Sequence, residues 1–213
     1  MDGRQTCLRM VISTPETLKT MNPLDNLNKY SIILGSASPR RRQLLADLGI
    51  DFQVARLNGI EEVYPESLNV DEIPVFLSQL KANAFHLAPS QLLITADTIV
   101  VAEGNPLGKP ANYSEAVGML EMLSGKKHKV ITGVTVRSTL QSSSFSATTI
   151  VDVAPLSHDE IDYYIERYKP YDKAGAYGIQ EWIGCIGIRG IEGSFYNVMG
   201  LPLHRLYCEL KKF

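Results

Sequence analysis

One segment near the N-terminus, residues 31–49, constrains the fold more than any other stretch of this chain. It begins with a short apolar run, residues 31–35, that predicts a buried strand followed by a turn of small residues. Ser38 then occupies an N-cap position, Pro39 follows at the first helical position, and Gly49 is a natural helix stop. The segment therefore predicts a strand, a tight turn and a helix whose free N–H groups suit an anion such as phosphate.

Three consecutive arginines, residues 40–42, lie in the first turn of this predicted helix. The helix dipole favours acidic residues there, so three cations are unfavourable unless an anion binds among them. The alternative is that the arginines form a solvated face of a surface helix. The conflict between the charges and the dipole makes this turn a candidate anion site.

Hydrophobic periodicity predicts that strands and helices alternate along the rest of the chain. The expected strands are residues 51–57, 91–101, 128–137, 144–153 and 182–189, with a hairpin-like return at 103–110. The expected helices are residues 71–88 and 114–123, one that begins with a capping box of Ser157 and Glu160, and a last one ending near Lys212. This pattern indicates an α/β fold with a mixed sheet.

Residues 1–29 differ from the rest of the chain. They mix Thr, Asn, Pro and charges of both signs without sustained periodicity. We therefore expect residues 1–29 to be a loosely ordered N-terminal extension and residues 30–213 to be one domain.

An acidic residue, Asp97, interrupts the apolar run 92–101. A carboxylate inside a buried strand is costly unless it is paired, hydrogen-bonded or bound to a metal. Asp97 is therefore interpreted as an acid that holds a cation or activates water, with a purely structural role as the alternative. The same interruption leaves no apolar stretch long enough to span a membrane.

Several other polar residues have both an ordinary and a functional interpretation. Glu61 and Glu62 form an acidic turn, Lys81 adjoins an apolar helix face, and Lys109 lies between Gly and Pro in a defined loop. The ordinary interpretations are surface charge for the two acids and for Lys109, and a lysine that extends to solvent for Lys81. The functional interpretation of Lys81 is phosphate contact from the helix edge. Gln180 follows a glycine loop, and its amide can both donate and accept hydrogen bonds. It can therefore either read the edge of a nucleotide base or be an ordinary loop amide whose hydrogen bonds are satisfied within the protein.

The bulk composition is that of an ordinary globular chain. Of its 213 residues 45% are hydrophobic and 21% charged, and the net charge of −2 gives no broad case for nucleic acid or an anionic membrane as partner. Cys7, Cys185 and Cys208 form neither a disulfide framework nor a zinc pattern, which indicates a reducing, cytoplasmic location. His128 and His158 have no partner at ligand spacing and are interpreted as structural or surface residues.

Taken together, these motifs resemble the Maf family of nucleoside triphosphate pyrophosphatases, in family order over about residues 30–210. The matching pieces are Ser36-Ala37-Ser38-Pro39-Arg40-Arg41, Glu61-Glu62, Lys81-Ala82, Ala96-Asp97-Thr98, Gly108-Lys109-Pro110, Ser124-Gly125 with His128 and Thr132, residues 172–180, and Val198-Met199-Gly200-Leu201-Pro202.

The resemblance implies a fold related to that of inosine triphosphatases: an elongated α/β protein with a mixed twisted sheet, a cleft between two lobes and often a homodimer. It implies hydrolysis of a nucleotide between its α- and β-phosphates with a divalent cation, Mg²⁺ foremost and Mn²⁺ or Co²⁺ as alternatives. By motif position, Asp97 matches the general base, and Glu62 and Asp97 match the metal-associated carboxylates. The phosphate-contacting positions are matched by Ser36, Arg41, Lys81 and Lys109.

Three positions separate the branches of this family. The branch that acts on dTTP and UTP has the residues found here, Arg40, Thr98 and Gln180, whereas the branch that acts on 7-methyl-GTP has Trp, Gln and Glu. The expected substrates are therefore dTTP and UTP, with CTP and modified pyrimidine nucleotides as further candidates. Two alternatives remain: a nucleotide-binding regulatory protein with little turnover, and the same chemistry on another nucleotide such as 7-methyl-GTP. The segment 150–155 departs from the family pattern because it lacks the acid and Phe common there.

Overall fold

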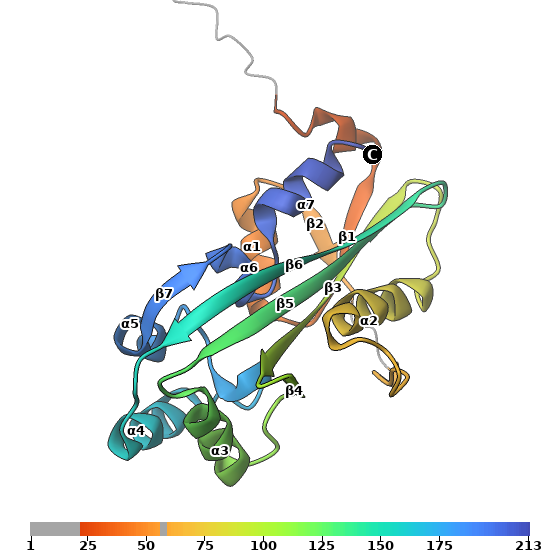
Figure 1. Ribbon diagram of the computed structural model, residues 1–213. Helices are drawn as coiled ribbons and strands as arrows, with labels where there is room; N and C mark the ends of the chain where they lie inside the picture. Colours follow the sequence, from red (N-terminus) through yellow and green to blue (C-terminus); the bar gives the residue numbers. More distant parts are fainter. Residues whose placement is uncertain (1–21, 56–58) are drawn as a thin grey trace, which may run out of the picture.

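The structure is a computed structural model that describes residues 22–55 and 59–213 (Figure 1). Its strands are β1 (Ser31–Gly35), β2 (Phe52–Val54), β3 (Gln91–Ala102), β4 (Asn105–Leu107), β5 (Lys127–Arg137), β6 (Ser142–Val153) and β7 (Ile188–Glu192). Its α-helices are α1 (Pro39–Asp47), α2 (Ile73–Asn83), α3 (Tyr113–Leu123), α4 (His158–Tyr168), α5 (Trp182–Gly187), α6 (Phe195–Met199) and α7 (Leu203–Leu210). Short 3-10 helices are η1 (Asp25–Lys29), η2 (Val70–Glu72) and η3 (Ala174–Ala176).

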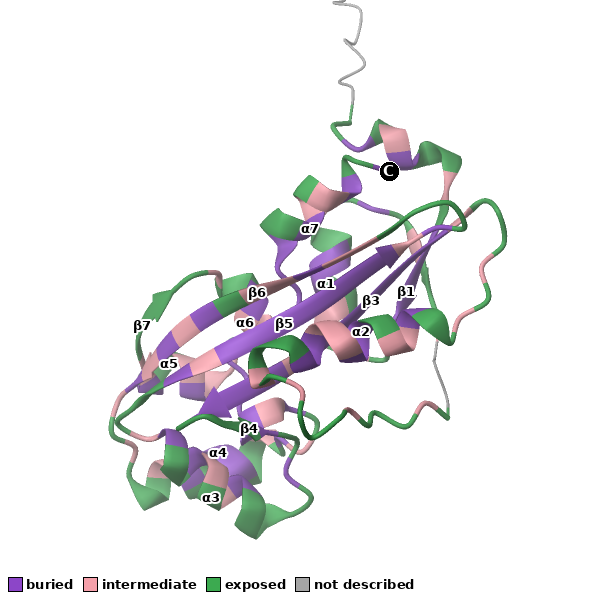
Figure 2. Ribbon diagram, turned by 45° about the vertical axis from the view of Figure 1, so that its right-hand side comes forward, coloured by how far each residue is buried: buried purple, intermediate pink, exposed green. Residues whose placement is uncertain are grey.

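The strands form one mixed sheet in the order β2-β1-β3-β5-β6-β7, with β4 also paired to β3. β1 pairs in parallel with β2 and β3, and the remaining pairs are antiparallel. The central strands β3 and β5 are buried along most of their length (Figure 2). The predicted α/β fold with a mixed sheet is confirmed.

The sheet has an open edge in the middle of β3. β1 pairs with β3 as far as Thr95, and β4 pairs with it again only from Val100. Among the described strands, none pairs with residues 96–99 on this side, while β5 pairs with them on the other. Consecutive strand residues point to opposite faces, so this gap opens both Asp97 and Thr98 to the space beyond the end of β1.

Helix α2 covers one face of the sheet, packing its buried residues on β3 and β5 (Figure 1). It lies so close to β5 that a Cβ at Gly133 would be 2.2 Å from the carbonyl carbon of Pro74. Glycine is therefore required at this position, which is also the residue opposite Asp97 in the sheet.

Two separate apolar cores cover the opposite face. The first contains residues of η1, α1 and α7, and the second contains residues of α3, α4 and α5. The long strands β3 and β5 run through both, so they join two lobes. None of the helices in the described part of the chain has the length and hydrophobicity that a membrane span requires.

The structure corrects the prediction for residues 182–189. They form helix α5 and only the first residues of β7, not a strand. Ile183 and Gly187, four residues apart, are the buried positions of this helix, and a Cβ at Gly184 would collide with the carbonyl of Ile179. A short apolar run with glycines does not distinguish helix from strand by periodicity, so packing decided the outcome.

Residues 22–29 also differ from the expected loosely ordered extension. Leu24 and Leu27 are buried in the first core, and Asn26 Nδ2 donates to the carbonyl of Leu210 at 2.8 Å. The apolar burial at these two leucines explains their order. Residues 1–21, with Cys7, lie outside the described residues.

Two predicted elements are shorter than expected. The helix predicted at 71–88 is η2 followed by α2, which ends at Asn83. The strand predicted at 51–57 is β2, Phe52–Val54, and residues 56–58 lie outside the described ranges. The remaining expected strands and helices, including the capping box of Ser157 and Glu160, are confirmed within a few residues.

Candidate active site

A cavity of about 510 Å³ lies at the carboxyl end of β1, between the two lobes. Its size suits a ligand as large as a nucleotide. Its lining includes all nine residues that the resemblance matched to catalytic, metal, phosphate or specificity positions: Ser36, Arg40, Arg41, Glu62, Lys81, Asp97, Thr98, Lys109 and Gln180. They come from the β1–α1 turn, α1, the acidic turn, α2, β3, the loop after β4 and the glycine loop.

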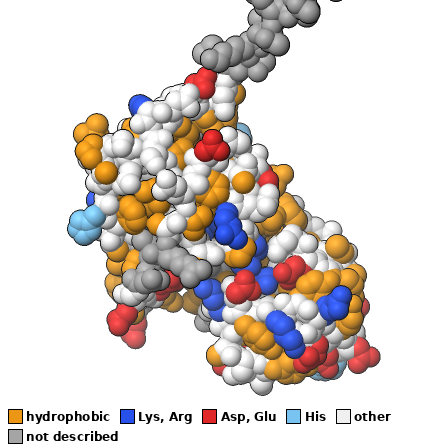
Figure 3. All heavy atoms as spheres, turned by 180° about the vertical axis from the view of Figure 1, so that it is seen from behind, with side chains coloured by type: hydrophobic (Ala, Val, Ile, Leu, Met, Phe, Trp, Pro, Cys, Tyr) orange, Lys and Arg blue, Asp and Glu red, His pale blue; other side chains and the backbone are white. Residues whose placement is uncertain are grey.

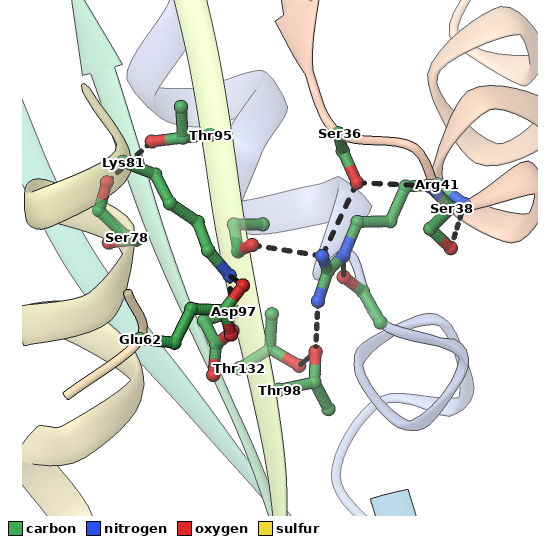
Figure 4. Close-up of polar contacts among 12 residues, drawn as sticks. Ser36, Ser38, Arg41, Glu62, Ser78, Lys81, Thr95, Asp97, Thr98 and Thr132 are labelled. Atoms are coloured by element: carbon green, nitrogen blue, oxygen red, sulfur yellow. Dashed lines mark hydrogen bonds and ion pairs between the residues drawn. The ribbon is translucent and has the colours of Figure 1, made fainter. Parts of the chain in front are cut away.

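Lys81 lies between two carboxylates on the α2 side of β3 (Figure 4). Its Nζ is 2.6 Å from Oδ1 of Asp97 and 3.0 Å from Oε1 of Glu62. Asp97 is only 8% exposed, so this ion pair offsets the cost of burying its carboxylate in the strand. Lys81 therefore points into the cavity rather than out to solvent.

The position of Lys81 follows from the way α2 sits on the sheet. Ser78, one turn earlier on the same helix, shares a 2.8 Å hydrogen bond with the hydroxyl of Thr135 on β5, and its carbonyl accepts from Thr95 Oγ1 at 2.7 Å. Together with the close approach at Gly133, these bonds fix the helix against β3 and β5. Lys81, on the same face, then reaches Asp97.

Arg41 occupies the other side of β3 (Figure 4). Its Nε donates to the carbonyl of Gly200 at 2.8 Å, Nη1 to the carbonyl of Ala96 at 2.9 Å, and Nη2 to Thr98 Oγ1 at 2.8 Å. Burial lowers the pKa of the guanidinium, although an arginine still carries its charge near neutral pH. These acceptors are neutral oxygens, so Arg41 keeps a positive charge available to an anion in the cavity.

The β1–α1 turn has the geometry that its sequence predicts. Ser38 is the N-cap of α1, with its side chain accepting from the backbone N–H of Arg41 at 3.4 Å, and Pro39 is the first helical residue. Ser36 Oγ lies beside the same arginine, 3.4 Å from Nη1. The first helical turn and the arginine therefore present donors to one region of the cavity.

The three residues that the resemblance predicts to select the base lie in different surroundings. Thr98 Oγ1 accepts a hydrogen bond from Arg41 and is 2.9 Å from Thr132 Oγ1, so Thr98 helps to hold the Arg41 guanidinium in place. Arg40 Nη1 is 2.9 Å from Oδ2 of Asp172, and Gln180 is exposed at the cavity. The structure brings all three to the cavity, and their part in base selection stays a prediction.

Lys109 lies in the loop after β4. The carbonyl of the preceding Gly108 accepts from the N–H of Gly175 at 3.0 Å, which holds this loop against the glycine loop. Gly175 itself has φ +68° and faces Val100, a packing that leaves little room for a side chain. The defined loop predicted around Lys109 is confirmed, and its lysine lines the cavity.

Sequence analysis missed a group of charged residues next to the glycine loop. Lys173 Nζ is 2.7 Å from Oδ1 of Asp172 and 3.1 Å from Oε1 of Glu181, and the Lys173 side chain is 8% exposed. Burial acts to raise the pKa of Asp172, but hydrogen bonds from Lys173 and Arg40 outweigh it and hold that pKa below its usual value. The adjacent acid and base at 172–173 were the available signal.

His128 has a structural role, as expected. Its Nε2 is 2.7 Å from the hydroxyl of Tyr177, whose side chain lines the cavity. Burial lowers the pKa of His128 to about 4 and raises that of Tyr177. His158 is a surface residue, with Nδ1 3.4 Å from Oε1 of Glu121.

Asp97 and Glu62 are suitable ligands for a divalent cation. Both carboxylates already converge on one positive group, the ammonium of Lys81. Mg²⁺ typically takes one or two protein carboxylates and completes its shell with water and substrate phosphates. The described residues contain no group of three or more His, Cys, Asp or Glu arranged to hold a metal, so the remaining ligands would come from substrate and water.

The chain is similar to curated proteins over most of its length. The family model described as Maf-like protein matches residues 31–213. The dTTP/UTP pyrophosphatase of Phocaeicola vulgatus is 58% identical over 191 residues, which cover 89% of this chain and 99% of that protein. The proteins of the same name from Porphyromonas gingivalis and Cytophaga hutchinsonii are 53% and 50% identical, each over 89% of this chain and over 98% and 87% of their own length.

Similar solved structures are more distant in sequence. The HAM1 protein from Coxiella burnetii has a TM-score of 0.47 and 14% identity, covering 86% of this chain and all of that one. The Ham1 protein of Staphylococcus aureus has a TM-score of 0.47 and 14% identity, covering 85% and 98%.

Proposed function

This chain belongs to the Maf-like protein family, and from that premise we propose that it hydrolyses dTTP and UTP to the nucleoside monophosphate and pyrophosphate. CTP and modified pyrimidine triphosphates are further candidate substrates. The observation that carries the proposal is the open edge of β3, which presents the Lys81–Asp97 pair and the Arg41 guanidinium to the same cavity. An acid and several cations around one cavity suit cleavage of a polyphosphate.

The cationic groups bind the triphosphate. Arg41, Lys81 and Lys109 line the cavity, and the N-terminal turn of α1 with Ser36 adds hydrogen-bond donors. As the leaving pyrophosphate accumulates negative charge, these fixed groups stabilise it more than they stabilise the bound substrate. In phosphoryl chemistry, positioning and electrostatic stabilisation of this kind account for most of the rate enhancement.

Asp97 acts as the general base. Its Oδ1 accepts from Lys81, which keeps the carboxylate oriented while Oδ2 takes a proton from water. The water oxygen bonds to the α-phosphorus, and the bond from that phosphorus to the α,β-bridging oxygen breaks. The products are the nucleoside monophosphate and pyrophosphate. Proton acceptance of this kind contributes about 10²- to 10⁴-fold to the rate.

Glu62 and Asp97 would hold the divalent cation, for which we propose Mg²⁺. When bound, the ion supplies positive charge to the phosphate oxygens. Without the ion, the ammonium of Lys81 keeps both carboxylates paired. Mn²⁺ and Co²⁺ are the alternatives that a metal-replacement assay would compare.

The test is pyrophosphate release by the purified full chain with dTTP, UTP, CTP, 7-methyl-GTP and ATP. We expect dTTP and UTP to have the highest kcat/KM. Tight nucleotide binding without release would instead support the regulatory alternative, and a preference for 7-methyl-GTP would support the other branch. Arg40→Trp, Thr98→Gln and Gln180→Glu together should raise the 7-methyl-GTP to dTTP ratio.

The proposal includes a homodimer in the cytoplasm that uses small nucleotides and neither nucleic acid nor membrane as partners. The net charge of −2 and the three widely spaced cysteines support this environment. Light scattering coupled to size-exclusion chromatography tests the dimer directly.

A further inference from the structure

Four residues of alternating charge form a line beside the cavity, and three of them, Arg40, Asp172 and Lys173, line it. Arg40 Nη1 is 2.9 Å from Asp172, Asp172 is 2.7 Å from Lys173 Nζ, and that nitrogen is 3.1 Å from Glu181. Arg40 belongs to α1 in the first lobe, whereas the other three flank the glycine loop next to the second core. Figure 3, the view from behind, shows basic and acidic side chains next to one another in the middle of that face of the molecule.

Burial within this line is uneven. The side chains of Lys173 and Glu181 are 8% and 19% exposed, whereas that of Asp172 is 57% exposed. A buried lysine is stable only when it is paired, so Lys173 depends on both carboxylates. The exposed pair of Asp172 with Arg40 is weak by itself and owes its geometry to the buried end.

Tyr164 fixes the inner end of the line. Its hydroxyl, on the buried side of α4, hydrogen-bonds to Glu181 and accepts from the N–H of Gly178 at 2.9 Å. The same hydroxyl therefore ties the Glu181 carboxylate to the backbone of the glycine loop.

Gln180 is linked to this arrangement through Gly178. A Cβ at Gly178 would lie 2.9 Å from Nε2 of Gln180 and 2.9 Å from Cδ of Glu181. Both side chains thus approach the same point beside Gly178. The inner end of the line, at Glu181, therefore lies next to Gln180.

We propose that Lys173 is a positioning residue that makes Arg40 and Gln180 act as one base-selecting unit across the cavity. The inference rests on the proposed function, because it concerns which nucleotide base that activity accepts. Lys173 acts on Arg40 through Asp172 and on Gln180 through Glu181, so it aligns two groups from different lobes without contacting the reacting phosphates.

The first experiment is steady-state pyrophosphate release by full-length Lys173→Met with dTTP and dATP. We expect KM for dTTP to rise about tenfold with kcat within about twofold, while kcat/KM for dATP stays nearly unchanged, so that the dTTP to dATP preference in kcat/KM falls about tenfold. Lys173→Arg should restore the preference because it keeps the charge. Lys126→Met is the matched control, since Lys126 pairs with Glu103 at 2.7 Å on the exposed surface.

The second experiment does not require Lys173→Met to fold. Arg40→Ala, Gln180→Ala and the double variant are compared by the Kd of α,β-imido-dUTP, an uncleaved analogue. We expect each single change to raise the Kd about tenfold. The double change should raise the Kd by far less than the product of the two single effects, because either change breaks the same unit.

The outcomes separate the two proposals. Independent effects of Arg40→Ala and Gln180→Ala, or an unchanged base preference in folded Lys173→Met, overturn the positioning role. If Arg40→Ala and Gln180→Ala have coupled effects on the Kd of the analogue but the wild-type chain releases no pyrophosphate, the enzymatic function is overturned and the base-selecting unit of Arg40 and Gln180 is supported. A wild-type chain that neither binds the analogue nor releases pyrophosphate overturns both.

Discussion

Replacing Gly133 by alanine tests whether the contact between α2 and β5 sets the catalytic geometry. The added Cβ would lie 2.2 Å from the carbonyl carbon of Pro74, whereas ordinary contact begins near 3.4 Å, so α2 must move by about 1 Å. Lys81 lies two turns further along α2, and its Nζ is 2.6 Å from Asp97. The displacement therefore reaches the ion pair at the site.

The expected magnitude follows from this displacement. A misplacement of about 1 Å at a catalytic group costs about 10²-fold in rate, and overpacking of a core costs about 1–3 kcal/mol. For a chain of this length, each kcal/mol lowers Tm by about 2–4 °C. Gly133→Ala should therefore lower both kcat for dTTP and Tm.

The assay combines pyrophosphate release with thermal unfolding, and Gly118→Ala is the matched control. Gly118 lies in α3 with open space around it, and alanine is a better helix former by about 1 kcal/mol. We expect the control to keep its kcat and to gain slightly in Tm. A Gly133→Ala protein with wild-type kcat would refute the coupling, even if its Tm fell.

Three further changes test other parts of the structure. Asp97→Asn should lower kcat by about 10²-fold or more while the analogue still binds, and wild-type turnover would remove Asp97 as the base. Leu27→Ala should lower the free energy of unfolding in urea by about 2–5 kcal/mol, whereas Leu140→Ala, which is 93% exposed, should have little effect; equal midpoints would contradict the burial of Leu27. The pKa of His128 is about 4 in the folded chain and about 6.5 when unfolded, so the unfolded state binds more protons and about 3 kcal/mol of stability should be lost as the pH falls from 6.5 to 4. His128→Gln should flatten that loss in urea titrations across this range, and an equal slope in both proteins would exclude His128 as its source.

Local signals in the sequence determined the start of several main elements. Ser38 and Pro39 predicted the start of α1, and Ser157 with Glu160 predicted that of α4, because a helix cap depends on residues within one turn. The β-branched run around Asp97 likewise predicted β3. The candidate residues were also found from sequence, some, such as Asp97 and Lys81, from their own local chemistry and others, such as Ser36 and Thr98, only from the resemblance of their motifs to the family.

The tertiary structure decided how those residues meet. Lys81 lies between Asp97 and Glu62, and Thr98 bonds to Arg41. Both contacts depend on the gap between β1 and β4 and on the pairing of Asp97 with Gly133. Such contacts join positions far apart in the chain and leave no local periodicity to detect.

The same reason explains the elements that sequence alone did not predict. The apolar residues 182–187 suit a helix or a strand equally well. Their tight packing is visible only in the structure, where a Cβ at Gly184 would collide with the carbonyl of Ile179. Leu24 and Leu27 are apolar residues in a polar stretch, and they are ordered because the C-terminal helix α7 and the first core cover them. The sequence thus determined what each segment can form, and long-range burial determined which of those forms the chain adopts.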